Sequence, residues 1–181
     1  MTLPLLPAVL NTGDYIDNDY VDRNRAYHDY YGATRPSCMV RSTMKNLDNS
    51  LRNLPNATTT FMTTDDSAEY TVDEIGYTTF WTVGNVDRIT IPVTGRWVVW
   101  LEFVIVGATS GGARAGFQQD GGADTWITST TNFSGANTYL NGSRQVSVAA
   151  NATFDFIIWQ NSGAAEEVGA SRWGVWFLGE D

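Results

Sequence analysis

The stretch TGRWVVWLEFVIVG, residues 94–107, decides how this chain folds. In an extended strand, successive side chains point to opposite faces. One face would carry Trp97, Val99, Leu101, Phe103 and Ile105. The other would carry Val98, Trp100, Glu102, Val104 and Val106. Because both rows are apolar apart from Glu102, we expect a strand that is buried on both faces.

The composition is that of one domain with a substantial core and an appendage, since the chain has 181 residues. Aromatic residues make up 13% of it, whereas charged residues are only 17%, below the usual quarter. The net charge of −9 is opposite in sign to that of a typical nucleic-acid binder. Cys38 is the only cysteine, which excludes an intrachain disulfide and fits a reducing cytoplasm. We therefore expect no nucleic-acid partner.

The first 32 residues differ in sequence pattern from the rest of the chain. Residues 1–12 are predicted to form an extended arm, because the apolar run lacks a basic start and contains two prolines. Residues 13–31 have helical spacing, and Gly32 follows as a stop signal. The apolar side of this predicted helix carries Ile16, Tyr20, Tyr27 and Tyr31. Since no apolar stretch is long enough to span a bilayer, we expect no membrane insertion.

From Ala33 onward, Thr, Val, Trp, Phe and Gly dominate, and turn signals recur at short intervals. The expected strands are 37–44, 57–63, 68–72, 77–82, 86–92, 96–106, 113–119, 125–130, 144–149, 153–160 and 171–178. Many short strands without intervening helices are typical of an antiparallel sandwich or barrel. The sequence thus divides into an arm with a short helix, 1–32, and an all-β head, 33–181.

Residues with catalytic potential are few. The single histidine, His28, lies ten residues from Cys38, and no acid is placed to orient such a pair. The carboxylate-rich segment around Asp22 fails as a calcium loop, because Asp22 stands where glycine is needed. Glu102 and Asp155 lie in expected strands, but nothing distinguishes them as a hydrolytic pair. We expect a protein that is not an enzyme and has no cofactor and no metal site.

Residues 86–106, VDRITIPVTGRWVVWLEFVIV, resemble the jelly rolls of the tumour necrosis factor and complement globular-head superfamily, including its phage members. That pattern is a strand ending in proline and followed by Gly-x-aromatic-x-Val-x-Leu. It is met here by Ile91, Pro92, Gly95, Trp97, Val99 and Leu101. The likeness extends over about residues 37–181.

Three further segments add to the resemblance. TFDFIIWQNSG (153–163) is similar to the strand that ends in an aromatic-Gln-Asn-Ser-Gly loop. SRWGVWFL (171–178) resembles the closing strand, with Gly174 at its middle, and residues 68–80 resemble the segment that leads into the core. One departure is AANAT (149–153), where the family usually has Gly-Asp in the turn.

The resemblance implies a jelly-roll sandwich that assembles as a homotrimer, with one sheet facing the other two subunits. It would place the second row of residues 94–107 toward the threefold axis. The expected trimer interface consists of Val98, Trp100, Glu102, Val104, Arg172 and Tyr139. Three copies of Glu102 would then approach one another, and Arg172 or a metal ion on the axis would compensate their charge.

The N-terminal segment Pro7 to Asp14, with Asn24 in the following helix, is similar to the short leaders of phage structural proteins. This resemblance implies a virion protein that assembles in the host cytoplasm. The helix face of Ile16, Tyr20, Tyr27 and Tyr31 would attach it to other virion proteins.

Three functions are compatible with these resemblances. The first is a minor tail or fibre protein whose head contacts a host-surface glycan or protein, with Trp126 and Phe133 as exposed contact residues. The second is a capsid decoration or head-fibre protein. The third is a secreted, complement-like trimeric ligand.

Overall fold

A computed structural model describes residues 36–44, 52–63, 70–75, 81–82, 88–131, 133, 135 and 137–180. All elements in these ranges are strands. The predicted arm and helix of residues 1–31 lie outside the described residues. The attachment residues Ile16, Tyr20, Tyr27 and Tyr31 therefore stay a prediction, as does the boundary between residues 32 and 33.

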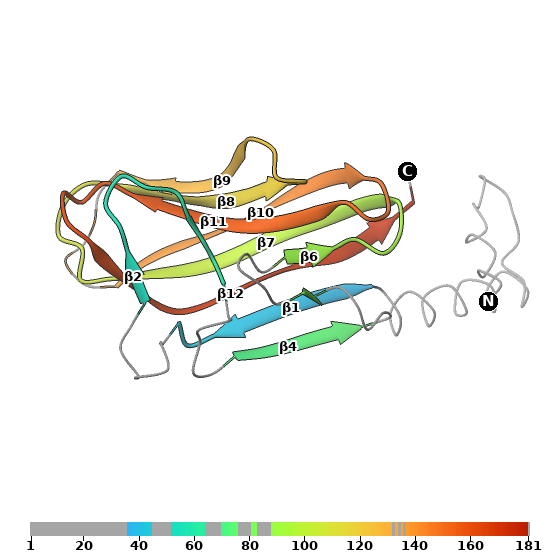
Figure 1. The fold of residues 1–181 in the computed structure, drawn as a ribbon, viewed down its shortest axis with the longest axis horizontal. Helices are drawn as coiled ribbons and strands as arrows, with labels where there is room; N and C mark the ends of the chain where they lie inside the picture. Colours follow the sequence, from blue (N-terminus) through green and yellow to red (C-terminus); the bar gives the residue numbers. More distant parts are fainter. Residues whose placement is uncertain are drawn as a thin grey trace, which may run out of the picture.

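Two antiparallel sheets stack into a sandwich, which confirms the predicted fold class (Figure 1). The first, here called the β7 sheet, has the order β10(Thr138–Val148), β7(Gly95–Val106), β12(Glu166–Gly179), β1(Ser37–Ser42) and β4(Tyr70–Ile75), with β2(Arg52–Leu54) paired to β12. The second, the β11 sheet, has the order β5(Trp81–Thr82), β6(Arg88–Thr90), β11(Thr153–Gln160), β8(Ala113–Gln119) and β9(Asp124–Thr130), with β3(Thr60–Phe61) paired to β11. The teal segment in Figure 1 that contains β2 and β3 crosses from one sheet to the other.

Strand β10 is longer than the sequence predicted, because it begins at Thr138 instead of residue 144. Its Asn-Gly-Ser centre has the composition of a turn but pairs continuously with β7, with Gly142 opposite Leu101. A Cβ at Gly142 would lie 2.7 Å from the Cγ2 atom of Ile127 on β9. Close packing between the two sheets therefore explains a glycine within a strand.

Strand β12 begins at Glu166, five residues before the predicted start, and β2 was not predicted. The two errors have one cause, since β2 pairs with the unpredicted beginning of β12. Short polar segments of this kind become strands through pairing and not through local propensity. The remaining strands overlap their predicted ranges.

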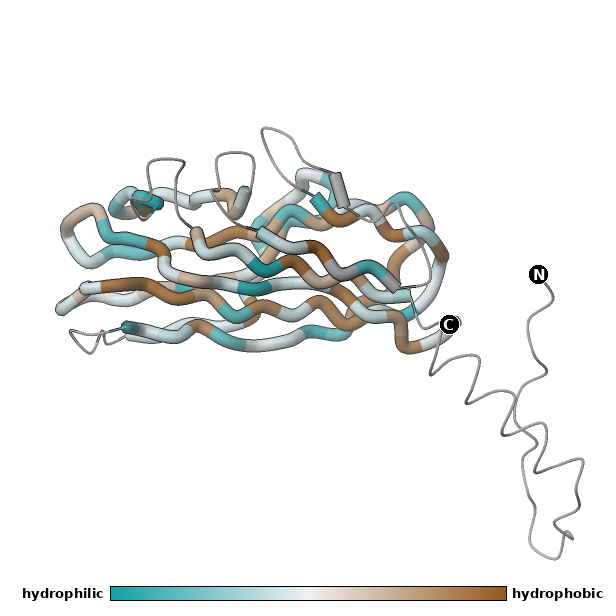
Figure 2. The backbone as a smooth tube through the Cα atoms, turned by 90° about the horizontal axis from the view of Figure 1, so that it is seen from below, coloured by the Kyte–Doolittle hydropathy of each residue, from teal (hydrophilic) through white to brown (hydrophobic). Residues whose placement is uncertain are grey.

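The core fills the space between the sheets and contains the first row of β7, with every member at most 1% exposed. Trp173 of β12 joins the two layers. Its ring packs edge-on against Phe103 at 5.7 Å and lies 6.3 Å from Phe156 of β11. Alternation of apolar and polar residues along the strands is visible as brown and teal segments in Figure 2. Burying each large side chain of this kind contributes about 1.5–3 kcal/mol.

Gly95 and Asn151 lie in the segments discussed for the family resemblance, and the backbone conformation at each position explains which residue stands there. Gly95 has a φ of 148°, and a Cβ there would lie 2.5 Å from the carbonyl oxygen of Gly179. In the unusual turn before β11, Asn151 adopts a φ of 70°, and its N–H donates to the carbonyl of Ile91 at 2.7 Å. Asparagine tolerates the left-handed region better than most residues, so the departure from Gly-Asp leaves a regular turn.

Gln160, at the end of β11, is fully buried and organises the Gln-Asn-Ser-Gly loop. Its amide nitrogen donates to the carbonyl oxygens of Leu54 at 3.1 Å and Ala164 at 2.8 Å. Its amide oxygen accepts the N–H of Ser162 at 2.6 Å. Because a buried amide must satisfy its hydrogen bonds, this glutamine connects β2 to the loop that precedes β12.

Asp155 on β11 is the one buried charged residue among those described, with 2% of its surface exposed. Arg88 of β6 binds both carboxylate oxygens, with Nε–Oδ1 at 3.1 Å and Nη2–Oδ2 at 3.2 Å. Burial raises the pKa of Asp155 above 3.8, and the charge and hydrogen bonds of Arg88 oppose this shift without cancelling it. The ionised carboxylate is therefore less favourable in the folded chain than in water.

The variant Asp155→Asn should gain stability relative to the natural chain as the pH rises from 4 to 7. A raised folded pKa contributes stability that is complete below pH 3.8 and is lost as the pH passes through the folded pKa. An amide has no such dependence. Urea unfolding midpoints at several pH values measure the difference, with Glu167→Gln on β12 as a control for charge loss. A relative loss of stability by the variant would mean that Arg88 outweighs burial.

Candidate functional site

The outward face of the β7 sheet carries the second row of the opening stretch. Val98, Trp100 and Glu102 are half-buried, and Val104 is buried. The first row points into the core, so the sequence-based phase of the strand is confirmed. The second row is thus only partly covered within a single chain.

Neighbouring strands continue this face. In the β12 register, Trp176 lies opposite Val98 and Gly174 lies opposite Trp100. The rings of Trp100 and Trp176 are 6.1 Å apart between centroids. On the other side of β7, Tyr139 of β10 lies opposite Val104.

We call this surface the outer patch; it consists of Met39, Val98, Trp100, Val104, Tyr139 and Trp176. Tyr139 is 59% exposed and Trp176 is 38% exposed. They are two of the three large apolar side chains that are exposed within the described ranges, and Tyr70 is the third. The outer patch spans four adjacent strands, from β10 to β1.

An ion pair lies beside the outer patch. Arg172 of β12 donates to one carboxylate oxygen of Glu102, through Nη2 at 2.7 Å and through Nε at 3.2 Å. The Glu102 side chain is 35% exposed and that of Arg172 is 50% exposed. The structure therefore confirms Arg172 as the partner of Glu102 within one chain. An exposed pair of this kind adds little to stability but leaves no isolated charge beside the apolar residues.

A β-bulge sets this pairing. Gly169 lies opposite Val104 and Arg172 lies opposite Glu102, so β12 has one more residue than β7 between these positions. Ser171 is buried in the bulge, where its Oγ accepts the N–H of Val104 at 3.3 Å and donates to the carbonyl of Gly169 at 2.9 Å. The extra residue shifts the side-chain phase of β12 and brings Arg172 to the outer face.

The structure brings all six predicted interface residues, Val98, Trp100, Glu102, Val104, Arg172 and Tyr139, to one sheet face. Their role in a trimer stays a prediction. Sequence reasoning missed Met39 and Trp176. Strand alternation from Arg172 through Gly174 would have placed Trp176 on the same face.

The prediction of Phe133 as an exposed receptor contact is wrong. Its side chain is 8% exposed and belongs to the core. The loop after β9 is held against the sandwich by a hydrogen bond from the N–H of Gly135 to the carbonyl of Ala108, which favours burial of the nearby apolar ring. Trp126 is half-buried on the β11 sheet, where the guanidinium carbon of Arg114 lies 4.7 Å from its ring centroid.

In the described part of the chain, no group of three or more His, Cys, Asp or Glu residues is arranged to hold a metal ion. None of the described segments is a helix long and apolar enough to cross a membrane. Glu102 and Asp155 lie on strands of different sheets.

No known family model matches the sequence, and no curated protein is significantly similar to it. The fold is similar to that of the globular domain of zebrafish complement 1qA, with a TM-score of 0.54 and 9% sequence identity over 81% of this chain and 99% of that domain.

Two further solved structures share the architecture. Eiger TNF from S. frugiperda has a TM-score of 0.53 and 8% identity, covering 82% of this chain and 95% of that one. Murine APRIL has a TM-score of 0.50 and 9% identity, covering 79% of this chain and 99% of that one. The described part of this chain therefore has the jelly-roll fold of tumour necrosis factor and complement C1q domains.

Proposed function

We propose that this chain forms a homotrimer through the outer patch and is the projecting, host-contacting head of a tailed-phage minor tail or fibre protein. The observation that carries the proposal is the outer patch itself. The outer patch places apolar side chains on four adjacent strands beside one ion pair, and two of them, Tyr139 and Trp176, are exposed. Such a surface is typical of one that a protein covers. In a symmetric homo-oligomer, each chain buries the outer patch of its neighbours, so the patch is covered in every copy.

The ion pair supports an arrangement around an axis. Each copy of Glu102 has its own Arg172 at 2.7 Å, so three copies can approach without three uncompensated carboxylates. A guanidinium suits this position because its planar group has five N–H donors. Some of them bind the carboxylate of Glu102, and others can donate hydrogen bonds to a neighbouring chain. A metal ion on the axis is the alternative means of compensation.

The virion role rests on the N-terminal resemblance, Pro7 to Asp14 with Asn24, in residues that the structure does not describe. In this proposal the protein is assembled in the host cytoplasm, the arm attaches to other virion proteins, and the head contacts a host-surface glycan or protein. It acts without catalysis or a cofactor. Capsid decoration is the first alternative. A complement-like trimeric ligand is the second, supported by the fold likeness to the zebrafish complement domain.

A chain that begins at Ala33 should remain trimeric but fail to join phage particles. The described sandwich contains its own core, whereas the predicted attachment residues precede Ala33. Sedimentation velocity measures the oligomeric state of the truncated chain. Incorporation of full-length and truncated chains into purified particles, followed by gold labelling in electron microscopy, measures attachment. Label on the capsid favours decoration over host contact. Incorporation of the truncated chain contradicts the attachment role of the arm.

A further inference from the structure

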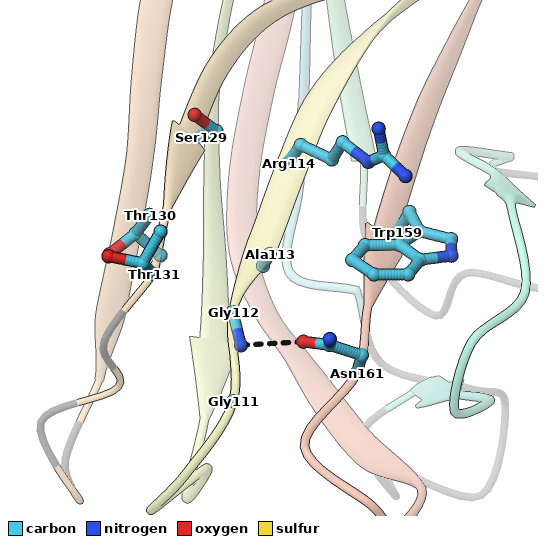
Figure 3. A pocket seen from close by; sticks show the side chains of 9 residues that line it. All are labelled: Gly111, Gly112, Ala113, Arg114, Ser129, Thr130, Thr131, Trp159 and Asn161. Atoms are coloured by element: carbon cyan, nitrogen blue, oxygen red, sulfur yellow. Dashed lines mark hydrogen bonds between the residues drawn. The ribbon is translucent and has the colours of Figure 1, made fainter.

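A groove of about 300 Å³ lies on the β11 sheet, away from the outer patch (Figure 3). The backbone of residues 111–113 borders it where β8 begins. Its side-chain lining includes Arg114, Ser129, Thr130, Thr131, Trp159 and Asn161. We call it the Arg114 groove. Because the outer patch belongs to the β7 sheet, the Arg114 groove stays open in the proposed trimer.

Arg114 is held in place by two indole rings. Its guanidinium carbon lies 4.4 Å from the ring centroid of Trp159 on β11 and 4.7 Å from that of Trp126 on β9. Both distances are within the range of cation–π attraction. Two rings that hold one guanidinium restrict its rotation, so the side chain is ordered before any ligand arrives.

Arg114 has no carboxylate partner among the described residues. Its Nε is buried without a hydrogen-bond acceptor, whereas its two terminal nitrogens are not among the buried unpaired atoms. Arg88 and Arg172, by contrast, each bind a carboxylate. In a chain with a net charge of −9, an ordered arginine that no acid neutralises is available to an anionic ligand.

The other lining groups indicate what kind of anion fits. Ser129 and Thr131 supply hydroxyl groups that donate and accept hydrogen bonds. The amide oxygen of Asn161 accepts the N–H of Gly112 at 2.7 Å, which leaves the amide NH₂ to donate. Trp159 supplies an aromatic surface for C–H groups. Two hydroxyl groups, one amide NH₂, one aromatic surface and one guanidinium together match a pyranose that carries a carboxylate.

We propose that the Arg114 groove binds a single acidic sugar unit, a uronic or sialic acid residue of a glycan. A volume of about 300 Å³ is at the small end of ligand sites, which suits one monosaccharide. One shallow site binds weakly, and three sites on a trimer raise the avidity for a polymeric glycan. The inference names the ligand class of the proposed host contact and rests on that role only for the source of the glycan.

Titration of the ¹⁵N-labelled full-length protein with sodium glucuronate and with N-acetylneuraminate, followed by NMR, tests the proposal. Glucose and acetate are the control ligands: glucose has the sugar ring without a charge, and acetate has the carboxylate without a ring. At least one of the two acids should shift the indole signal of Trp159 and bind roughly tenfold more tightly than glucose or acetate. The proposal is overturned if glucose or acetate binds equally well, or if neither acid binds at about 50 mM.

Two variants separate recognition from structure. Arg114→Met keeps the aliphatic stem and should remove the preference for the acid, whereas Arg144→Met on β10 should retain it. Thr131→Trp fills the exposed side of the groove with Arg114 intact and should abolish binding of every sugar. If Arg114→Met folds and keeps the tenfold preference, or if Thr131→Trp still binds, the assignment is wrong. A trimer that binds neither acid contradicts this inference alone, and a monomer that binds glucuronate contradicts the trimer alone.

Discussion

Replacement of Trp100 by glutamate should abolish the trimer and yield monomeric or insoluble protein. Trp100 lies on the outer patch, with the ring of Trp176 at 6.1 Å and Gly174 opposite it on β12. In an assembly its indole would be buried at the centre of the interface, where truncation of an aromatic residue typically costs more than about 2 kcal/mol. Glutamate would also add a second carboxylate near Glu102, and Arg172 cannot neutralise both.

Sedimentation velocity at micromolar concentration measures the effect on assembly. The matched control is Trp126→Glu, which makes the same change at a half-buried tryptophan of the β11 sheet and should leave the trimer intact. If the Trp100→Glu variant sediments as the natural assembly does, the outer patch is not the interface.

Gly174→Ala should destabilise the fold by about 3 kcal/mol, because a single methyl group at this position collides with backbone. The added Cβ would lie 2.2 Å from the carbonyl oxygen of Cys38 and 3.0 Å from the Cα of Met39 on β1. It would also approach the indole nitrogen of Trp100 to 3.1 Å. The glycine thus allows β1, β12 and the outer patch to pack closely.

Chemical denaturation compares this variant with Gly121→Ala. At Gly121 a Cβ meets no atom within 4 Å, but the φ of 67° disfavours alanine by roughly 1 kcal/mol. A larger loss of stability in Gly174→Ala than in Gly121→Ala would distinguish the effect of a steric collision from that of an unfavourable backbone conformation. Equal losses in the two variants would show that β1 adjusts to the methyl group.

Much of the fold follows from strand periodicity. The two apolar rows of β7 predicted a strand with a core face and a second covered face, and the phase of both rows is confirmed. The same periodicity placed Glu102 on the outer face, the family resemblance placed Arg172 near it, and their ion pair is present. Periodicity succeeds here because β7 is long and regular and is paired with a strand on each side.

Bulges and tertiary packing account for what the sequence did not predict. The bulge near Ser171 changes the side-chain phase within β12. A second irregularity, between Ala115 and Gly116 in the pairing of β8 with β9, affects the phase around Trp126. No local sequence pattern predicts where a strand will contain a bulge. The stacking of Arg114 between two tryptophans was therefore not predicted. The burial of Phe133 depends likewise on where its loop folds back.

The mass of the natural full-length protein in solution, measured by sedimentation equilibrium at micromolar concentration, tests the proposed assembly most directly. We expect a single species of about three times the chain mass of 19.9 kDa that does not dissociate on dilution short of unfolding. Such a species would account for the outer patch and for the ion pair beside it. A stable, soluble monomer of 19.9 kDa at the same concentration would contradict the account.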